Sequence, residues 1–212
     1  MKKIGVILIA IMLLGMLTAC GGSVSPSQQP ANSQPAIAEI QQALEHLRGS
    51  WEDNVFTSEY LGLRFIMPDN WESFTEEELI EMTVSSMEII DVSDFTEFPD
   101  MTALNPITDA HIIIVYERLP PHLTQISALE FIEAAAVNLR RPGIEVNLDF
   151  PGTTRIGAYD WYSIEAFVDM HGTSFYTRYF TIVKDGFAIT INIGHNEVSE
   201  SVEEILAMFS PL

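Results

Sequence analysis

The hydrophobic and polar positions in the last third of the chain predict two consecutive hairpins of long strands. Asp185-Gly186 is typical of a two-residue type I′ hairpin turn, and His171-Gly172 is expected to turn the preceding hairpin in the same way. The turns fix the cross-strand register. The predicted pairs are Lys184 with Phe187, Ile182 with Ile189, Phe180 with Ile191, Phe167 with Tyr176, and Glu165 with Arg178.

In this register both faces of the predicted antiparallel sheet are apolar. An antiparallel sheet with one face in water is polar on that face, so both faces here need a cover. Helices are the cover that the rest of the sequence offers. We therefore expect an α+β fold, an antiparallel sheet covered by helices on both faces (an α/β/α sandwich). One face carries Trp161, Phe167, Tyr176, Phe180, Ile182, Ile189 and Ile191, and the other carries Ile164, Ala166, Val168, Phe175, Tyr179 and Val183.

The remaining elements follow from periodicity and capping patterns. Thr75 with Glu78 and Ser127 with Glu130 form capping boxes, which predict helices that run to about Ile90 and to Arg141, where Pro142-Gly143 stops the second. Further helices are expected over 36–48 and from about Ser199, the latter with Val202, Ile205, Leu206 and Phe209 on its buried face. Strands are expected at Val55–Ser58, Leu63–Met67, Ala110–Arg118 and 144–150, and an irregular acidic loop at 91–106.

The N-terminal segment has the pattern of a secretion signal. Lys2 and Lys3 precede a short apolar stretch of about 13 residues, too short to span a bilayer. Leu17-Thr18-Ala19-Cys20 resembles the lipobox of bacterial lipoproteins, and Cys20 is the one cysteine of the chain. We expect residues 1–19 to be a signal peptide and Cys20 to carry the lipid. The alternative is an ordinary signal peptide with an incidental cysteine.

The expected mature chain is a spacer at 20–50, with a disordered part rich in Gly, Ser and Pro, and one domain at 51–212. The whole chain has 10 basic and 30 acidic side chains, a formal net charge of −20. Such a charge excludes binding to a phosphate backbone, so no nucleic acid is expected as a partner. It favours another envelope protein or a cationic ligand, although solubility alone also accounts for it.

A family resemblance is carried by two stretches. Residues 54–71 contain Gly62 and the motif Phe65-Ile66-Met67-Pro68-Asp69-Asn70-Trp71, and residues 183–191 read Val-Lys-Asp-Gly-Phe-Ala-Ile-Thr-Ile. Both are similar to PsbP-like domains, in particular those of uncharacterised Gram-positive lipoproteins, over most of 51–212. The resemblance implies the α/β/α sandwich named above. It also implies a binding or assembly subunit without a shared catalytic centre.

The candidate chemistry is sparse. The histidines are His46, His111, His122, His171 and His195, and no two of them have the spacing of a helical zinc site. Asp91, Asp94, Glu97 and Asp100 lie three apart and either bind a hard cation such as Ca²⁺ or form a solvated loop. Glu165 and Arg178 are expected to form a structural ion pair. Trp51, Trp71 and Trp161 are expected in the core or at its rim rather than in a carbohydrate or peptide surface.

These observations predict a non-catalytic binding or assembly module that is lipid-anchored through Cys20 on the extracytoplasmic face of the cell membrane. No catalytic residue, metal site or cofactor is assigned. The alternatives are a cell-envelope hydrolase, which needs clustered acids or a histidine in a cleft, and a lipoprotein that captures a small ligand. A site lined by convergent polar groups would favour the alternatives.

Overall fold

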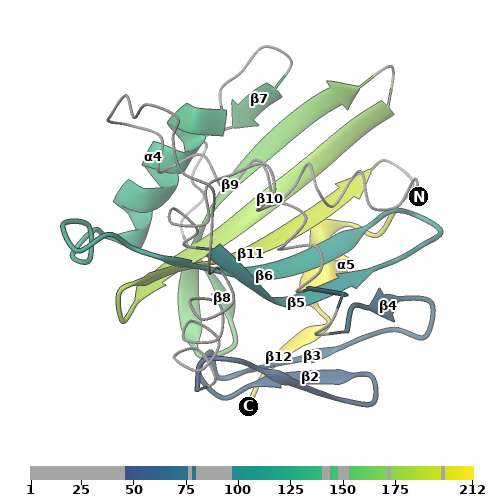
Figure 1. Ribbon diagram of the computed structural model, residues 1–212. Coiled ribbons are helices and arrows are strands. Elements are labelled where there is room, and N and C mark those ends of the chain that lie inside the picture. Colours follow the sequence, from purple (N-terminus) through teal and green to yellow (C-terminus); the bar gives the residue numbers. More distant parts are fainter. Residues whose placement is uncertain are drawn as a thin grey trace, which may run out of the picture.

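The structure is a computed structural model, in which the chain forms two antiparallel sheets and two helices within the described residues (Figure 1). The residues described are 46–75, 78–79, 97–139, 144–147, 153–170, 173–196 and 199–212. The expected fold, one sheet covered by helices on both faces, is therefore wrong. One face of the larger sheet is covered by a second sheet, and α4 (Ala128–Leu139) packs on the other face.

The smaller sheet has four strands in the order β1-β2-β3-β12. The expected strands at Val55–Ser58 and Leu63–Met67 are confirmed as β2 and β3, while the helix expected to reach Phe209 is wrong at its end. The short helix α5 (Val202–Leu206) stops first, and Phe209 then pairs with Phe65. The bounds are β1 (Ser50–Glu52), β2 (Val55–Ser58), β3 (Leu63–Ile66) and β12 (Phe209–Pro211).

The larger sheet has eight strands in the order β4-β5-β6-β11-β10-β9-β7, with β8 paired to β9 outside this order. The expected loop at 91–106 is wrong in its second half, because Glu97 to Leu104 form β5 at the side of β6. The bounds are β4 (Glu72–Ser73), β5 (Glu97–Leu104), β6 (His111–Arg118), β7 (Ile144–Asn147), β8 (Thr153–Ile156), β9 (Tyr159–Met170), β10 (Thr173–Lys184) and β11 (Phe187–Asn196).

The predicted register of the two hairpins is confirmed. Asp185 and Gly186 both have positive φ, 51° and 81°, as a type I′ turn requires. All five predicted pairs are Cα partners in the structure, on β10 with β11 and on β10 with β9. The pattern predicted which side chains share a face because the turn length fixes the register.

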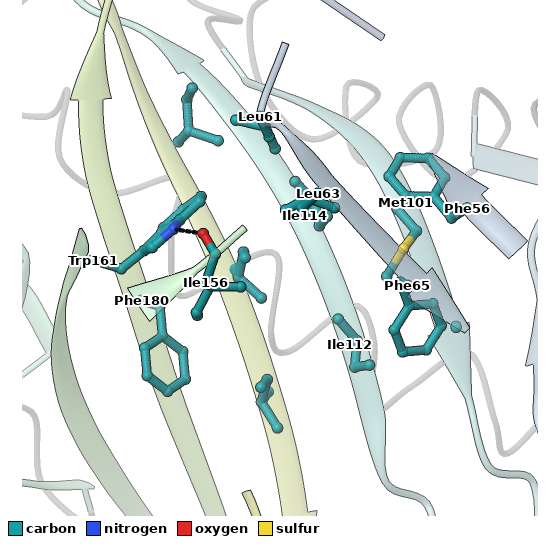
Figure 2. Close-up of a cluster of buried hydrophobic side chains, with 14 of the residues drawn as sticks. Phe56, Leu61, Leu63, Phe65, Met101, Ile112, Ile114, Ile156, Trp161 and Phe180 are labelled. Atoms are coloured by element: carbon teal, nitrogen blue, oxygen red, sulfur yellow. Dashed lines mark hydrogen bonds between the residues drawn. The ribbon is translucent and has the colours of Figure 1, made fainter. Parts of the chain in front are cut away.

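The main core lies between the two sheets, on what we call the inner face of the larger sheet. Side chains of the smaller sheet, among them Phe56, Leu63 and Phe65, pack against Ile112 and Ile114 of β6 (Figure 2). In the same cluster Trp161 donates from Nε1 to the carbonyl oxygen of Ile156 at 2.9 Å. The first strands and the last strand of the chain pair with one another, and so they supply the cover that helices were expected to supply.

The opposite face of the larger sheet, which we call the α4 face, is contacted by α4. Ile132, Ala136 and Leu139 of the helix pack on residues of β9 and β10. The capping box that predicted this helix is confirmed, since Glu130 accepts from the backbone and hydroxyl of Ser127 and its own amide donates to that hydroxyl. The box of Thr75 and Glu78 is confirmed as well.

Several sequence predictions lie outside the described residues. They are the signal peptide, Cys20, the spacer up to 45, most of the helix after Thr75, Asp91 and Asp94, and the turn at His171-Gly172. In the part of the chain that the structure does describe, no helix is both long and apolar enough to span a bilayer.

Candidate functional site

Five residues lie next to one another across five strands of the larger sheet, on the α4 face. Each is the Cα partner of the next, so together they form one continuous line, which we call the central row. All five side chains are buried, with at most 2% of the surface exposed. The central row consists of Thr102 on β5, Ile113 on β6, Asn192 on β11, Tyr179 on β10 and Ile164 on β9.

The polar atoms of the central row have no hydrogen-bond partner within the described structure. They are Oγ1 of Thr102, the hydroxyl of Tyr179, and both Oδ1 and Nδ2 of Asn192. A buried polar atom without a partner costs about 1–3 kcal/mol of stability, so proteins rarely leave several together. Burial also raises the pKa of Tyr179, which keeps its hydroxyl protonated and able to donate.

A further unpartnered atom lies beside this row. His111 is the Cα partner of Gly194, two residues along β11 from Asn192, and its imidazole lies against Gly194 where a Cβ would otherwise stand. The ring Nδ1 is 3.3 Å from the carbonyl oxygen of Asp109, whereas Nε2 is buried and has no described partner. Burial lowers the pKa of His111, so the ring is neutral.

Several other buried polar groups of the described residues are satisfied by protein. On the same face, one row further along, the hydroxyls of Thr181 and Thr190 lie 3.0 Å apart and hydrogen bond to each other. Polar groups are thus paired in one row and unpaired in the next, which marks the central row as the exception.

A second polar cluster, near α5, illustrates the same contrast. The carboxylate of Glu200 accepts from Trp71 Nε1 at 3.2 Å, from Asn105 Nδ2 at 2.8 Å and from Thr108 at 3.0 Å. These bonds hold loops around the end of the sheet, and every group in them has its partner. We therefore interpret the Glu200 cluster as structural.

The charged groups near the central row are few. The cations of β6 and β10, namely Arg118, Arg178 and Lys184, lie in register on the inner face of the sheet. Glu117 lies on the α4 face, two positions beyond Val115, and burial raises its pKa to about 7. On the described strands, therefore, no cation of β6 or β10 shares the α4 face with the row, and Glu117 is partly protonated at neutral pH.

The sequence-predicted histidines do not come together as a set. His46 and His122 are exposed, His111 is buried beside the central row, and His195 stacks on Tyr176 with ring centroids 5.3 Å apart. Within the described residues no cluster of three or more His, Cys, Asp or Glu forms that is suited to a metal ion. Glu97 lies on a strand, and Asp100 is 8% exposed and directed at Gly49, so neither belongs to a solvated loop.

The three tryptophans are confirmed as core and rim residues. Trp161 and Trp71 are buried, and Trp51 packs partly buried against Phe56 and Phe65. The cross-strand pairing of Glu165 with Arg178 is confirmed at 3.6 Å from Nε to the carboxylate. The pair is not buried, however, because about a quarter to a third of each side chain is exposed, and Glu203 of α5 is a second acidic partner at 3.6 Å.

Sequence reasoning missed the central row. The loop predicted at 91–106 contains Thr102, and the alternation Ile189-Thr190-Ile191-Asn192-Ile193 is that of a strand with one face in water. A signal was nevertheless present. Tyr179 and Ile164 are predicted on this face, and the register of the Asp185-Gly186 turn, carried further along β11, places the amide of Asn192 beside Tyr179 in a face that needs a cover.

Comparisons with known proteins give distant structural similarity and no family. No protein-family model matches the sequence, and no curated protein matches it. A protein of Bacteroides thetaiotaomicron VPI-5482 is similar in structure, with 10% identity and a TM-score of 0.40 over 71% of this chain and 45% of the other. LpqN, which is involved in cell envelope biogenesis of Mycobacterium tuberculosis, has 12% identity and a TM-score of 0.39 over 64% of this chain and 71% of its own.

The chain spans less than half of the Bacteroides protein that it matches. Similarity at this level defines no class to which the chain belongs. The resemblance to PsbP-like domains is not supported, since no family model matches and the sandwich that it implied is absent from the described residues.

Proposed function

We propose that this chain is an extracytoplasmic envelope protein, held at the cell membrane by a lipid on Cys20, and that it acts there as a non-catalytic binding module. The position is supported by the apolar N-terminal segment that ends in Leu17-Thr18-Ala19-Cys20. Two acyl chains on one sulfur are enough for a stable anchor, whereas one chain gives marginal binding.

The binding role is carried by one observation, the buried amide of Asn192 that has no partner for either of its polar atoms among the described residues. Thr102 and Tyr179 extend the same unmet hydrogen-bonding capacity on either side. A bound molecule that pairs with these atoms removes their desolvation penalty, so the free energy stored in the row becomes binding free energy. This supports capture of a small ligand over catalysis, because the row offers hydrogen bonds and no ionised acid or base.

The acidic composition supports a separate contact. A net charge of −20 attracts cationic ligands and basic patches of other envelope proteins over about a Debye length. Crosslinking in intact cells, followed by identification of the attached protein, tests this contact independently of the central row. Recovery of no envelope protein would leave ligand capture as the whole of the function.

The ligand-binding role is tested on the lipidated chain, purified from membranes of its host in a mild detergent. Native mass spectrometry of the wild type is expected to reveal a bound small molecule that organic extraction releases. Asn192→Leu is expected to abolish this extra mass. The matched control is Asn54→Leu, which makes the same substitution at an exposed asparagine and is expected to retain the mass. A wild type that carries no bound molecule, or an Asn192→Leu variant that retains it, would overturn ligand binding at the central row.

A further inference from the structure

The kind of ligand follows from the kind of atoms that lack partners. Asn192 presents a donor and an acceptor a few ångströms apart on one planar group, and the hydroxyls of Thr102 and Tyr179 both donate and accept. A group that only accepts, such as a carboxylate, can pair with the amide nitrogen of Asn192 but leaves its oxygen unpaired. A group that only donates, such as an ammonium, can pair with the oxygen but leaves the nitrogen unpaired. Full satisfaction needs a donor and an acceptor side by side in the ligand.

The charges around the central row also favour an uncharged ligand. The nearest cations of β6 and β10 lie on the opposite face of the sheet, and the imidazole of His111 is neutral. An anion bound at the row finds no counter-charge among the described residues of β6 and β10 on that face, and burial of an unpaired ion is strongly unfavourable. A cation meets a similar penalty, because the protonated Tyr179 and Asn192 carry no charge and Glu117, two rows away on the same face, is partly protonated at neutral pH.

The central row also contains two apolar residues. Ile113 separates Thr102 from Asn192, and Ile164 follows Tyr179 at the other end. Between its hydrogen-bonding atoms the row therefore presents hydrocarbon, as expected of a small site with a few placed polar groups.

We propose that the central row binds an uncharged group that carries a hydrogen-bond donor beside an acceptor, with the carboxamide as its simplest form, and that it rejects carboxylates and cations. This inference rests on the proposed binding function, and it adds the chemical class of the ligand.

Three probes of the same shape and different charge test it. Acetamide carries a donor and an acceptor, acetate only acceptors, and acetamidinium only donors. Each is titrated to about 50 mM into the full lipidated chain, because a probe with four non-hydrogen atoms binds weakly. The readout is the side-chain amide resonance of Asn192 in ¹⁵N-labelled protein, which is assigned from its loss in Asn192→Leu. Tyr179→Phe, which removes a single hydroxyl, serves as a second variant that keeps the resonance observable.

Acetamide is expected to shift the Asn192 resonance in a saturable way, with acetate and acetamidinium at least ten-fold weaker. Tyr179→Phe is expected to weaken the acetamide titration. An equal or stronger titration by either ion, or no saturable shift with acetamide, would overturn the proposed ligand class. If the native ligand found by mass spectrometry carries its charge at this row, the class inference fails while the binding function stands. If the wild type carries no ligand and no probe titrates, both fail.

Discussion

The carboxylate of Asp100 accepts hydrogen bonds from the backbone amide of Gly49, with Oδ1 at 3.1 Å and Oδ2 at 3.2 Å, although 51 residues separate them. Asp100 occupies the irregular position of β5, where the register with β6 shifts between Pro99 and Met101. On β6, the hydroxyl of Tyr116, which is the Cα partner of Phe98, donates to the carbonyl oxygen of Leu47 at 3.2 Å. Together these bonds fix the start of the smaller sheet to the larger one.

The Asp100 contact makes stability depend on pH. Burial raises the pKa of Asp100 to about 7, against the opposing effects of the Gly49 amide and the charge of Arg48. The folded state therefore holds a proton that the unfolded chain releases near pH 4. The stabilisation from this group is complete below that pH and is lost as the pH rises to about 7, with a slope of at most about 1.4 kcal/mol per pH unit.

We expect Asp100→Asn to flatten this dependence. Urea unfolding of both proteins between pH 4.5 and 7.5 measures it, and the difference between the two curves isolates Asp100. Glu117, which burial also raises to a pKa of about 7, contributes in the same direction, and His111, with its lowered pKa, in the opposite direction. Both are present in both proteins and cancel in the difference. Parallel curves for the two proteins would contradict the assigned proton.

The unpartnered hydroxyls of the central row predict a gain in stability when they are removed from the ligand-free protein. Thr102→Val and Tyr179→Phe preserve shape and delete a buried polar atom that has no described partner. We expect each to raise the free energy of unfolding by up to about 1 kcal/mol, because the desolvation penalty disappears with the atom. Denaturant titration of extracted, ligand-free protein provides the measurement.

The control is the same substitution at a partnered hydroxyl of the same face. Thr181→Val leaves the hydroxyl of Thr190 without its bond at 3.0 Å, and we expect a loss of about 1–2 kcal/mol. A similar loss of unfolding free energy in Thr102→Val would mean that the hydroxyl of Thr102 has a hydrogen-bond partner in the folded protein. The unpartnered atoms would then no longer support a binding site at the central row.

The sequence predicted the local geometry well and the long-range pairing badly. Asp185-Gly186 fixes a register through the length of its turn, so the pairs on β10 follow without further information. The pairing of Phe209 with Phe65 joins segments from opposite ends of the chain. Hydrophobic periodicity predicts that a segment is a strand, but it does not predict which distant strand pairs with it. The apolar faces of β2 and β3 are equally compatible with a separate sheet and with the edge of the larger sheet.

The burial of Asn192 was hidden for a related reason. Alternation tells which side chains share a face, but it does not tell whether water or protein meets that face. Three isoleucines of β11 point to the inner face, whereas Thr190 and Asn192 on the α4 face are polar. By itself β11 thus has the pattern of a strand with one face in water, although β9 and β10 are apolar on the same face. The sequence pattern does not show which segment covers the α4 face, and the burial of the central row depends on that cover.

Arg178 is expected to matter more than an ordinary surface arginine. It lies between Glu165 and Glu203, each at 3.6 Å, and its guanidinium lies 6.0 Å from the centre of the Phe180 ring. Removal of the side chain also exposes apolar surface that its stem covers. We expect Arg178→Ala to lower the free energy of unfolding by about 1 kcal/mol. Chemical denaturation at low ionic strength is the measurement.

Arg155→Ala is the matched control, because Arg155 pairs with Asp160 at 3.4 Å while both side chains are about 60% exposed. Exposed pairs contribute little, so we expect a change within about 0.5 kcal/mol. If Arg178→Ala changes the free energy of unfolding no more than this control does, the contacts of Arg178 with its two acids do not stabilise the fold.

Gly194 is expected to be intolerant of any side chain because of His111. A Cβ at this position would collide with the imidazole ring, whose Cε1 and Nε2 occupy the space over the glycine. We expect Gly194→Ala to lower the free energy of unfolding by about 1–3 kcal/mol, as overpacking of a close-packed interior does. His111→Ala opens a cavity at the same place and is destabilising for its own reason. If the two residues share that space, the double variant regains part of what the single variants lose, and the losses are non-additive by at least about 0.5 kcal/mol. Additive losses would show that the ring moves aside without cost, and the buried imidazole next to the central row would then not be held in place by the glycine.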